Sequence, residues 1–387
     1  MTEWQTVRLG EIVKTNQSTY SPKENWQFVN YLDTGNITMN KIDEIQYINS
    51  AKDKLPSRAR RKVKTNSIIY STVRPNQLHY GIIKKQPDNF LVSTGFTVID
   101  VNYDKAVPDF IYYALTKQEV TEQLQAIAEQ SVSAYPSLKP SDIENLELML
   151  PDKKTQERIV AILSSIDEKI KENSAINNNL EQQAQTIYQQ MFIDNARSDW
   201  AEGTLSDIAD ITMGQSPSGS SYNEDGTGTI FFQGRAEFGF RFPSVRLYTT
   251  EPKRIARSND TLMSVRAPVG DLNVAHMDCC IGRGLAAIHS KSHHQSFVLY
   301  TMFSLKKQLD VFNGEGTVFG SINRNSLNDM PILIPSDDIL DEFERIVVPM
   351  DLTIRNNYDE NCRLQDIRDT LLPRLMSGEL DVSDIEL

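Results

Sequence analysis

A long helical pattern occurs twice in this chain of 387 residues. Residues 151–192 and residues 335–376 align without a gap, which places Asp167 on Asp351 and Ile170 on Ile354. A helix of this length would span roughly 60 Å, because an α-helix rises about 1.5 Å per residue. The pattern therefore predicts a chain built from two repeats, each with a helix too long to be one wall of an ordinary domain.

Both copies carry residues at the heptad spacing that forms the contact line, or seam, of a coiled coil. The first seam contains Ile159, Leu163, Ile166, Ile170, Asn173, Asn177, Leu180, Ala184, Ile187 and Met191. The second contains Phe343, Val347, Met350, Ile354, Asn357, Asn361, Leu364, Arg368, Leu371 and Leu375. A seam needs a partner helix, so we predict that the two helices pair through the central members of each set. The alternative is that each helix packs separately on its own domain.

Two asparagines interrupt each seam at corresponding positions: Asn173 and Asn177 in the first, Asn357 and Asn361 in the second. Asparagine in a seam lowers stability but fixes the register, because only one alignment pairs the amides. We therefore expect these side chains to set how the two helices align.

The segments that precede the long helices also repeat, with insertions and deletions. Residues 68–75 (IIYSTVRP) resemble residues 261–268 (TLMSVRAP), each a short apolar strand followed by an arginine and a proline turn. Further strands, short aromatic helices and a last strand before the long helix follow in the same order in both segments. The predicted fold class is α+β, with two mixed α/β globules, each followed by a long helix, and with the two helices pairing as a coiled coil.

The net charge of −12 argues against a nucleic-acid partner until its distribution is considered. Residues 1–150 carry 17 basic and 17 acidic side chains, residues 196–336 carry 13 and 14, and residues 337–387 carry 5 and 14. The globular segments are therefore near neutral and can present basic faces. The sequence lacks a run of about 18 apolar residues and a signal-peptide pattern. Together with only three cysteines, this favours a cytoplasmic protein without a membrane partner.

The order of these features resembles the specificity subunits of type I restriction-modification systems. The resemblance covers essentially the whole chain and rests on the paired globule and helix repeat. It also rests on four sequence runs: PDKKTQERIVAILSSIDEKI at 151–170, LLPRLMSGEL at 371–380, GQSPS at 214–218 and FFQG at 231–234. The second copy departs at the start of its helix, where the counterpart of Glu157-Arg158, Glu344-Arg345, is shifted by three positions.

The resemblance implies a DNA reader with no chemistry of its own. Each globule would read one half of a split double-stranded DNA target. An antiparallel coiled coil would separate the halves and bind two methyltransferase subunits, which a restriction and translocase subunit would join. The implied domains are target recognition domains at 1–150 and 196–334, long helices at 151–195 and 335–380, and an acidic tail at 381–387. The alternative is a protein–protein scaffold with two peptide-binding globules on a coiled-coil frame.

Sequence reading requires Lys and Arg for phosphates, and Arg, Gln, Asn, Ser or Thr on loops for base edges. In the first globule, the basic run at 52–64 is interpreted as a phosphate clamp and the loop after Arg74 as a base reader. The candidates are Lys54, Arg58, Arg60, Arg61, Lys62, Arg74, Asn76, Gln77, Tyr80, Ser133 and Tyr135. A solvated basic loop and a plain hairpin are the alternatives.

In the second globule, the polar loop at 215–221 and the turn at 233–235 offer similar side chains. The candidates are Gln215, Ser216, Ser218, Gln233, Arg235, Arg266, Thr317 and Phe319. The phosphate-contacting face could contain Arg241, Arg246, Lys253, Arg254, Arg257, Arg266 and Arg283. The closing loops around Tyr135 and Phe319 either contact DNA or cap the sheet.

Catalytic and metal-binding functions find little support in the sequence. It contains neither a methyltransferase signature nor a phosphate-binding loop, and the spacing of Gly314, Gly316 and Gly320 does not fit a dinucleotide-binding motif. The histidines and cysteines between His276 and His294 do not have a known zinc-ligand spacing. Buried thiols and a polar histidine loop are the simpler interpretation. We therefore predict no catalytic residues, no cofactor and no metal.

Overall fold

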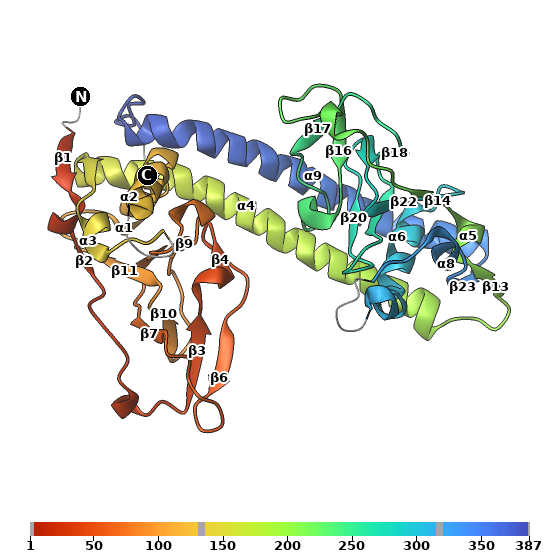
Figure 1. Ribbon diagram of the computed structural model, residues 1–387, viewed down its shortest axis with the longest axis horizontal. Coiled ribbons are helices and arrows are strands. Elements are labelled where there is room, and N and C mark those ends of the chain that lie inside the picture. Colours follow the sequence, from red (N-terminus) through yellow and green to blue (C-terminus); the bar gives the residue numbers. More distant parts are fainter. Residues whose placement is uncertain (1–3, 131–135, 315–319, 386–387) are drawn as a thin grey trace. The chain divides into compact units, whose positions relative to one another are not determined.

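The computed structural model describes residues 4–130, 136–314 and 320–385, and it divides into two compact units (Figure 1). The first unit comprises Met1–Lys171 and Asn361–Leu387, and the second comprises Glu172–Glu360. Two long helices, α4 (Lys153–Tyr188) and α9 (Asp337–Met376), each contribute one segment to each unit. Every unit therefore contains one globule and a part of both helices.

The globule of the first unit is built, within the described residues, from two four-stranded sheets and two short strand pairs. The sheets have the orders β6-β3-β10-β7 and β2-β11-β8-β9, and the pairs are β1-β12 and β4-β5. The strands are β1 (Gln5–Arg8), β2 (Val13–Thr15), β3 (Phe28–Leu32), β4 (Ile37–Thr38), β5 (Lys41–Ile42), β6 (Gln46–Asn49), β7 (Ala59–Lys62), β8 (Ile68–Ser71), β9 (Tyr80–Ile82), β10 (Phe90–Ser93), β11 (Phe96–Val101) and β12 (Glu147–Leu150). The helices are α1 (Pro108–Leu115), α2 (Gln118–Glu129) and α3 (Pro140–Glu144), with short 3-10 turns η1 (Leu9–Glu11), η2 (Pro22–Glu24), η3 (Thr34–Asn36) and η4 (Pro75–Gln77).

The globule of the second unit has the strand orders β14-β22-β19-β20, β15-β17-β16-β21-β18 and β13-β23. The strands are β13 (Ala201–Thr204), β14 (Ala209–Met213), β15 (Tyr222–Asn223), β16 (Thr229–Phe232), β17 (Leu247–Thr249), β18 (Ile255–Ala256), β19 (Thr261–Ser264), β20 (Leu272–Val274), β21 (Cys279–Ile281), β22 (Leu285–Ser290) and β23 (Pro331–Ile334). The helices are α5 (Leu205–Ile208), α6 (Gln295–Ser304), α7 (Lys306–Leu309) and α8 (Arg324–Asn328). Short turns η6 (Gly219–Ser221), η7 (Arg235–Glu237) and η8 (Asp310–Asn313) connect them, and a π-helical segment, η5 (Gln189–Asp194), extends α4.

The two globules share one topology. The order β2-β11-β8-β9 is repeated as β14-β22-β19-β20, and β6-β3-β10-β7 is repeated as β17-β16-β21-β18. The sheet β6-β3-β10-β7 has one parallel pair, β3 with β10, and its counterpart has one parallel pair, β16 with β21. The other neighbouring strands in these two four-strand orders are antiparallel. The predicted strands at 68–71 and 261–264 are β8 and β19. The predicted α+β class and its internal repeat are confirmed.

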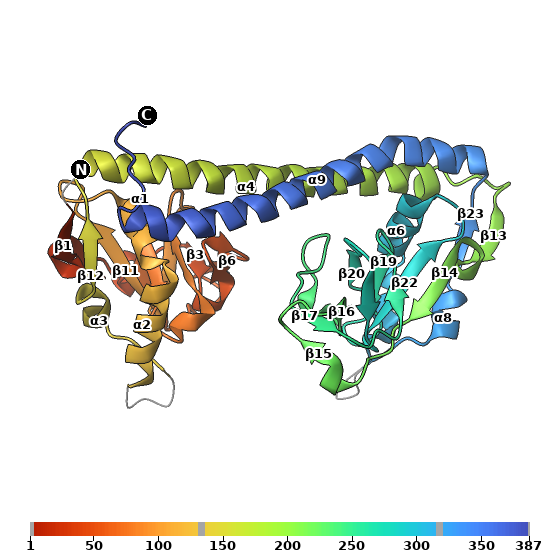
Figure 2. The ribbon, with the colours of Figure 1, turned by 90° about the horizontal axis from the view of Figure 1, so that it is seen from above.

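In the first unit, α4 and α9 run antiparallel. The guanidinium of Arg368 on α9 lies 3.1 Å from Asp167 on α4, and the Asn361 side chain donates to the carbonyl oxygen of Ile170 at 3.5 Å. Ile159 and Leu163 of α4 share a hydrophobic core with Leu375 of α9. Figure 2 shows these segments side by side, with α1 beneath them.

In the second unit, the asparagines of the two seams meet. The Asn357 side chain donates to the Asn177 side-chain oxygen at 2.8 Å, and Asn177 donates to the carbonyl oxygen of Ile354 at 3.2 Å. Asn173 donates to the Glu360 carboxylate at 2.7 Å. Other predicted seam residues are half-buried: Leu180 and Met350 in this unit, and Ile166, Ile170 and Leu364 in the first unit. The helices therefore pair in one register within each unit, and the alternative in which each packs alone is wrong.

Each globule is fastened to the long helix that follows it by a buried tyrosine. In the first unit, the Tyr113 hydroxyl of α1 donates to Asp167 of α4 at 2.7 Å. In the second unit, the Tyr300 hydroxyl of α6 donates to Asp351 of α9 at 2.8 Å. Burial raises the pKa of both tyrosines far above its ordinary value, so that both hydroxyls remain donors. Asp167 and Asp351 are aligned residues of the repeat, and this shared contact gives the alignment its physical reason.

None of the helices in the described ranges combines the length and the apolar character that crossing a bilayer would require.

Candidate nucleic-acid interface

Four separate segments of the first unit meet along one polar edge, which we name the first rim: Arg58, Thr72–Arg74, Thr94–Gly95 and Pro136–Leu138. Backbone hydrogen bonds join them. Thr94 donates to the Arg58 carbonyl at 2.9 Å, Thr72 to the Gly95 carbonyl at 2.8 Å, and Arg74 to the Pro136 carbonyl at 3.1 Å. The side chains of Arg58, Arg74 and Thr94 are exposed. The rim thus presents hydrogen-bond donors at an edge where the two sheets meet, an arrangement suited to base reading.

The turn beside this rim has a strained backbone. Arg74 (φ 48°) and Leu78 (φ 58°) adopt the left-handed conformation on either side of η4. Met39 (φ 46°), at the tip of the β4–β5 hairpin, adopts it as well and donates its N–H to the Leu78 carbonyl at 2.9 Å. Left-handed residues other than glycine and asparagine are uncommon and cost of order 1 kcal/mol each. Such strain concentrates at functional sites, and here it presents the exposed Asn76 and Gln77 side chains.

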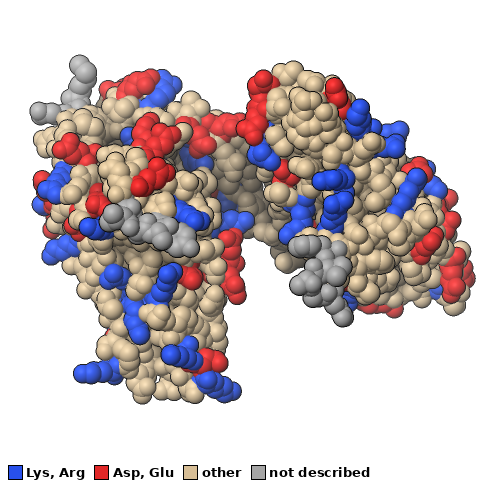
Figure 3. All heavy atoms as spheres, in the orientation of Figure 1, with Lys and Arg blue, Asp and Glu red and all other residues tan. Residues whose placement is uncertain are grey.

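The basic run of the first globule divides into exposed and engaged side chains. Lys54 and Arg58 are exposed, whereas Arg60, Arg61 and Lys62 lie on β7 and are half-buried. Burial lowers the pKa of Arg61. Figure 3 shows Lys and Arg gathered on the lower part of this unit, where β3, β6, β7 and β10 lie. The run is therefore part of a sheet edge and not a solvated loop throughout.

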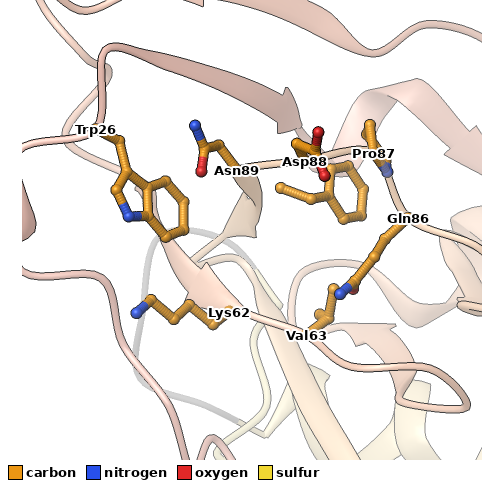
Figure 4. Close-up of a pocket in the computed structure, with 8 residues that line it drawn as sticks. Trp26, Lys62, Val63, Gln86, Pro87, Asp88 and Asn89 are labelled. Atoms are coloured by element: carbon orange, nitrogen blue, oxygen red, sulfur yellow. The ribbon is translucent and has the colours of Figure 1, made fainter.

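Lys62 is committed to neighbours inside the globule. It forms an ion pair with Glu24, and its ammonium group lies 5.1 Å from the centre of the Trp26 ring. Lys62 and Trp26 also border a hollow of about 350 Å³ (Figure 4). Its other lining residues are Val63, Gln86, Pro87, Asp88, Asn89 and Phe90. Lys62 therefore already has an acidic partner inside the globule, which offsets its charge.

Tyr80 is not available to read bases. It is only 4% exposed, and its ring stacks on that of Tyr70 with the ring centres 5.5 Å apart. All three residues of β9 are buried, because this strand closes one sheet against α1. The interpretation of Tyr80 as a DNA contact was wrong, and the buried apolar neighbours Ile82 and Ile83 were the signal that it belongs to the core.

The second unit has an equivalent edge, the second rim, which contains Gln215–Ser216, Gln233–Arg235, Val265–Ala267, Gly282–Gly284 and Gly320–Ile322. Val265 donates to the Gly284 carbonyl at 2.9 Å and Ala267 donates to the Gly320 carbonyl at 3.0 Å, as Thr72 and Arg74 do in the first rim. Gln215 donates to the Ile281 carbonyl at 3.0 Å, and the Arg283 N–H donates to the Ser216 hydroxyl at 3.2 Å. Gln215, Gln233, Arg235, Arg266 and Arg283 are exposed there.

Glycine permits this close approach of strands. A Cβ at Gly282 would lie 2.9 Å from the Cα of Gln233, which is closer than real side chains come. Gly282 therefore allows the β21–β22 turn to pack against the end of β16 and so places Arg283 beside Gln233. Arg235 pairs with Asp271 at 2.7 Å, and this carboxylate offsets its positive charge. Ser218 is exposed and its hydroxyl lies 2.8 Å from that of Ser220.

Arg241 does not belong to a phosphate-contacting face. It is only 4% exposed and lies 3.0 Å from Glu181 of α4 and 3.5 Å from Asp351 of α9. Its guanidinium also donates to the Tyr300 hydroxyl at 3.1 Å. This interpretation was wrong because the partners of Arg241 are distant in the sequence. Arg246, Lys253, Arg254 and Arg257 are exposed, as the prediction requires.

The arginines of the two proline turns are not structural equivalents. In each globule one residue near the turn forms an isolated β-bridge to the returning chain, Val73 with Ser137 and Arg266 with Ser321. Arg266 therefore corresponds to Val73, and Arg74 corresponds to Ala267.

Ser133, Tyr135, Thr317 and Phe319 lie outside the described residues. Sequence reasoning missed Thr94, although the glycine that follows it between two apolar strands marked the turn.

Both halves of the chain match one known protein family. A family model described as the type I restriction modification DNA specificity domain matches residues 1–182 and again residues 197–348. The chain belongs to this family. Specificity subunits are the DNA-recognition components of type I restriction systems and carry no catalytic activity, so the prediction of a non-catalytic recognition subunit is confirmed.

Two curated relatives are similar to this chain over nearly its whole length. The type I restriction enzyme HindI specificity subunit of Haemophilus influenzae is 26% identical and the alignment covers 98% of this chain and 100% of the relative. The putative type I restriction enzyme MjaX specificity subunit of Methanocaldococcus jannaschii is 27% identical, with 98% and 94% covered. The similarity therefore includes both globules and both long helices.

Two solved structures are similar to this chain. The HsdS subunit from Thermoanaerobacter tengcongensis is 30% identical with 97% of both chains covered, at a TM-score of 0.43. The S subunit of a type I restriction-modification system from M. genitalium is 16% identical and covers 99% of this chain and 97% of its own, with a TM-score of 0.60. The latter shows a shared fold.

Proposed function

We propose that this specificity subunit reads a split double-stranded DNA target, one half with each globule. The observation that carries the proposal is the pair of equivalent rims, each an exposed polar edge supported by the same strands of a repeated sheet. The two globules differ in the side chains that they present there. The first has Arg74 and Thr94 on its rim and Asn76 and Gln77 on the turn beside it, and the second has Gln215, Gln233, Arg266 and Arg283 on its rim. Unlike side chains on a common frame would read unlike half-sites.

The proposed partners are those of a type I restriction-modification system. Methyltransferase and restriction subunits would assemble on this chain, with two methyltransferase subunits matching its two repeats. One solved relative, 30% identical, comes from work on complex assembly and conformational transition of the type I system. We place the domains at 1–150, 151–195, 196–334 and 335–380 with a tail at 381–387, and the protein in the cytoplasm, where its DNA target would be.

A salt titration tests the DNA proposal against the scaffold alternative. The subunit, together with its methyltransferase partner, should bind a duplex that contains its methylated motif. The logarithm of its affinity should fall linearly with the logarithm of the salt concentration. Replacing Lys54 and Arg58 with glutamate should weaken binding to every sequence and reduce the slope by about 1–2. Binding that does not depend on salt, or no DNA binding with the partner present, would favour a peptide-binding scaffold.

Single rim arginines should act on one half-site only. Arg266→Ala should cost about 1–3 kcal/mol, or about 5- to 150-fold in affinity, for targets that carry the correct second half-site. Arg74→Ala should have the same effect on the first half-site. The measurement is sequencing of methylated motifs and binding to duplexes in which one half-site is scrambled.

Two lysines provide matched controls, because each lies beyond the far end of a strand that begins at a rim. Lys291 follows β22 and Lys105 follows β11, and both are exposed. Lys291→Ala and Lys105→Ala should leave the motif unchanged. A loss of recognition at both half-sites from either arginine variant would contradict separate reading by the two globules.

A further inference from the structure

Two histidines at the start of α6 lie against the start of α9 in the second unit. The Nε2 atom of His294 is 2.9 Å from a carboxylate oxygen of Asp341, and the Nε2 atom of His293 is 3.6 Å from the same oxygen. One possible ligand atom from each residue lies within 4.8 Å of the other two. Among the described residues, this is the only group of three or more His, Cys, Asp or Glu side chains gathered so closely.

We propose that His293, His294 and Asp341 bind one zinc-like dication. Two imidazole nitrogens and one carboxylate form a ligand set that Zn²⁺ prefers, whereas Mg²⁺ and Ca²⁺ prefer oxygen ligands. Ligand atoms around a tetrahedral zinc lie about 3.4 Å apart, since each is about 2.0–2.1 Å from the metal. The separations of 2.9 and 3.6 Å lie on either side of that value. Solvent would take the fourth position.

His294 is already oriented for this role. Its side chain is buried, and its Nδ1 atom is 2.9 Å from the hydroxyl of Ser292. In this structure Nε2–H donates to the Asp341 carboxylate. A bound ion would take the place of that proton, while a hydrogen bond from Nδ1–H to the Ser292 hydroxyl fixes the orientation of the ring, as a histidine ligand needs. The nearby Glu344 is engaged elsewhere, because its carboxylate accepts the Phe297 N–H at 2.8 Å.

The other histidines and the adjacent cysteines of this unit do not form such a group. His276 lies 2.6 Å from the single carboxylate of Asp359, and His289 lies 2.6 Å from that of Asp260. Cys279 and Cys280 are buried, and burial raises the pKa of Cys279 to about 12, so its thiol stays protonated. The proposal departs from the sequence-based expectation of no metal, because Asp341 lies 47 residues after His294 and no local spacing reveals it.

A bound ion would connect the loop before α6 to α9 and would stabilise the folded second unit by mass action. The test is a titration of the full chain, freed of metal by a chelator, with zinc chloride, read by calorimetry and by the thermal unfolding temperature. We expect one saturable equivalent of Zn²⁺ and a rise in unfolding temperature, with no such response to Mg²⁺. Co²⁺ in place of zinc should show the visible absorption of a low-symmetry site.

The exposed ligands give variants that should fold normally. His293→Ala and Asp341→Asn should each weaken zinc binding at least 10-fold and abolish the thermal shift. The control is His289→Ala, which removes a half-buried histidine with one carboxylate partner and should change neither. The visible spectrum of Co²⁺ should be lost only in the first two variants. Zinc binding that is unchanged in His293→Ala or Asp341→Asn, or the absence of a saturable equivalent in the parent chain, would overturn the proposal.

Discussion

Replacing Arg241 with alanine should lower the free energy of unfolding of the second unit by about 3–5 kcal/mol, the usual cost of removing one partner from a buried ion pair. Arg241 contacts Glu181 of α4, Asp351 of α9 and the Tyr300 hydroxyl of α6, and it is almost fully buried. Without the guanidinium, two carboxylates face each other inside the unit with no cation between them. Denaturant unfolding, followed together with hydrogen exchange of α6, measures the loss.

An exposed arginine of the same unit is the matched control. Arg197 pairs with Asp199, and both side chains are largely in solvent. Arg197→Ala should cost no more than about 1 kcal/mol, because exposed ion pairs contribute little. If Arg241→Ala costs no more than this control, the buried network does not hold the globule to the helices.

The loss caused by Arg241→Ala should shrink as the pH falls. Burial raises the pKa of Glu181 even with the attraction of Arg241, and removal of that cation would raise it further. A carboxyl group whose pKa is higher in the folded protein binds more protons there, so the free energy of unfolding decreases as pH rises. The variant should therefore approach the parent at pH 5 more closely than at pH 8. Adding Glu181→Gln to Arg241→Ala should recover part of the loss at pH 8 and remove most of this pH dependence.

The sequence predicted the long helices well, because their contacts follow a local period. The heptad spacing located the seam residues, and the asparagines Asn177 and Asn357 form the expected amide pair. The gapless alignment of the two copies also matched Asp167 with Asp351, which accept hydroxyls from Tyr113 and Tyr300. The regular period and the equal spacing of the two copies therefore predicted which residues of the long helices form contacts.

Positions on the globules were harder to predict, because partners distant in the sequence decide whether a side chain is buried. Arg241 looked like one of several surface arginines, yet Glu181 and Asp351 on two different helices hold it inside. The two rims could not be predicted as units for a similar reason, because each joins segments that only the sheet topology brings together. The register of Arg74 and Arg266 differs by one residue, and only the bridges Val73–Ser137 and Arg266–Ser321 reveal it.

Lengthening both long helices by one heptad should move the accepted spacing between half-sites by about three base pairs. The prediction rests on the proposed function. Seven residues add about 10 Å to a helix and keep the seam in phase, while DNA rises about 3.4 Å per base pair. The insertions belong after Lys171 and after Glu360, near the facing pairs Ile170–Asn361 and Asn173–Glu360. Affinity for the original target should fall about 10²–10⁴-fold, because the two globules could no longer bind together.

A library of duplexes with fixed half-sites and spacers that cover a full turn of DNA measures the new optimum. Three base pairs also rotate the second half-site by about a quarter of a turn, so the library must sample that phase. A heptad added to α4 alone is the control, because it separates Asn177 from Asn357 and should give no new optimum. An unchanged optimum in the doubly lengthened protein would show that the helices do not set the spacing. A changed half-site sequence would show that the helices take part in reading bases, since the insertions leave both rims intact.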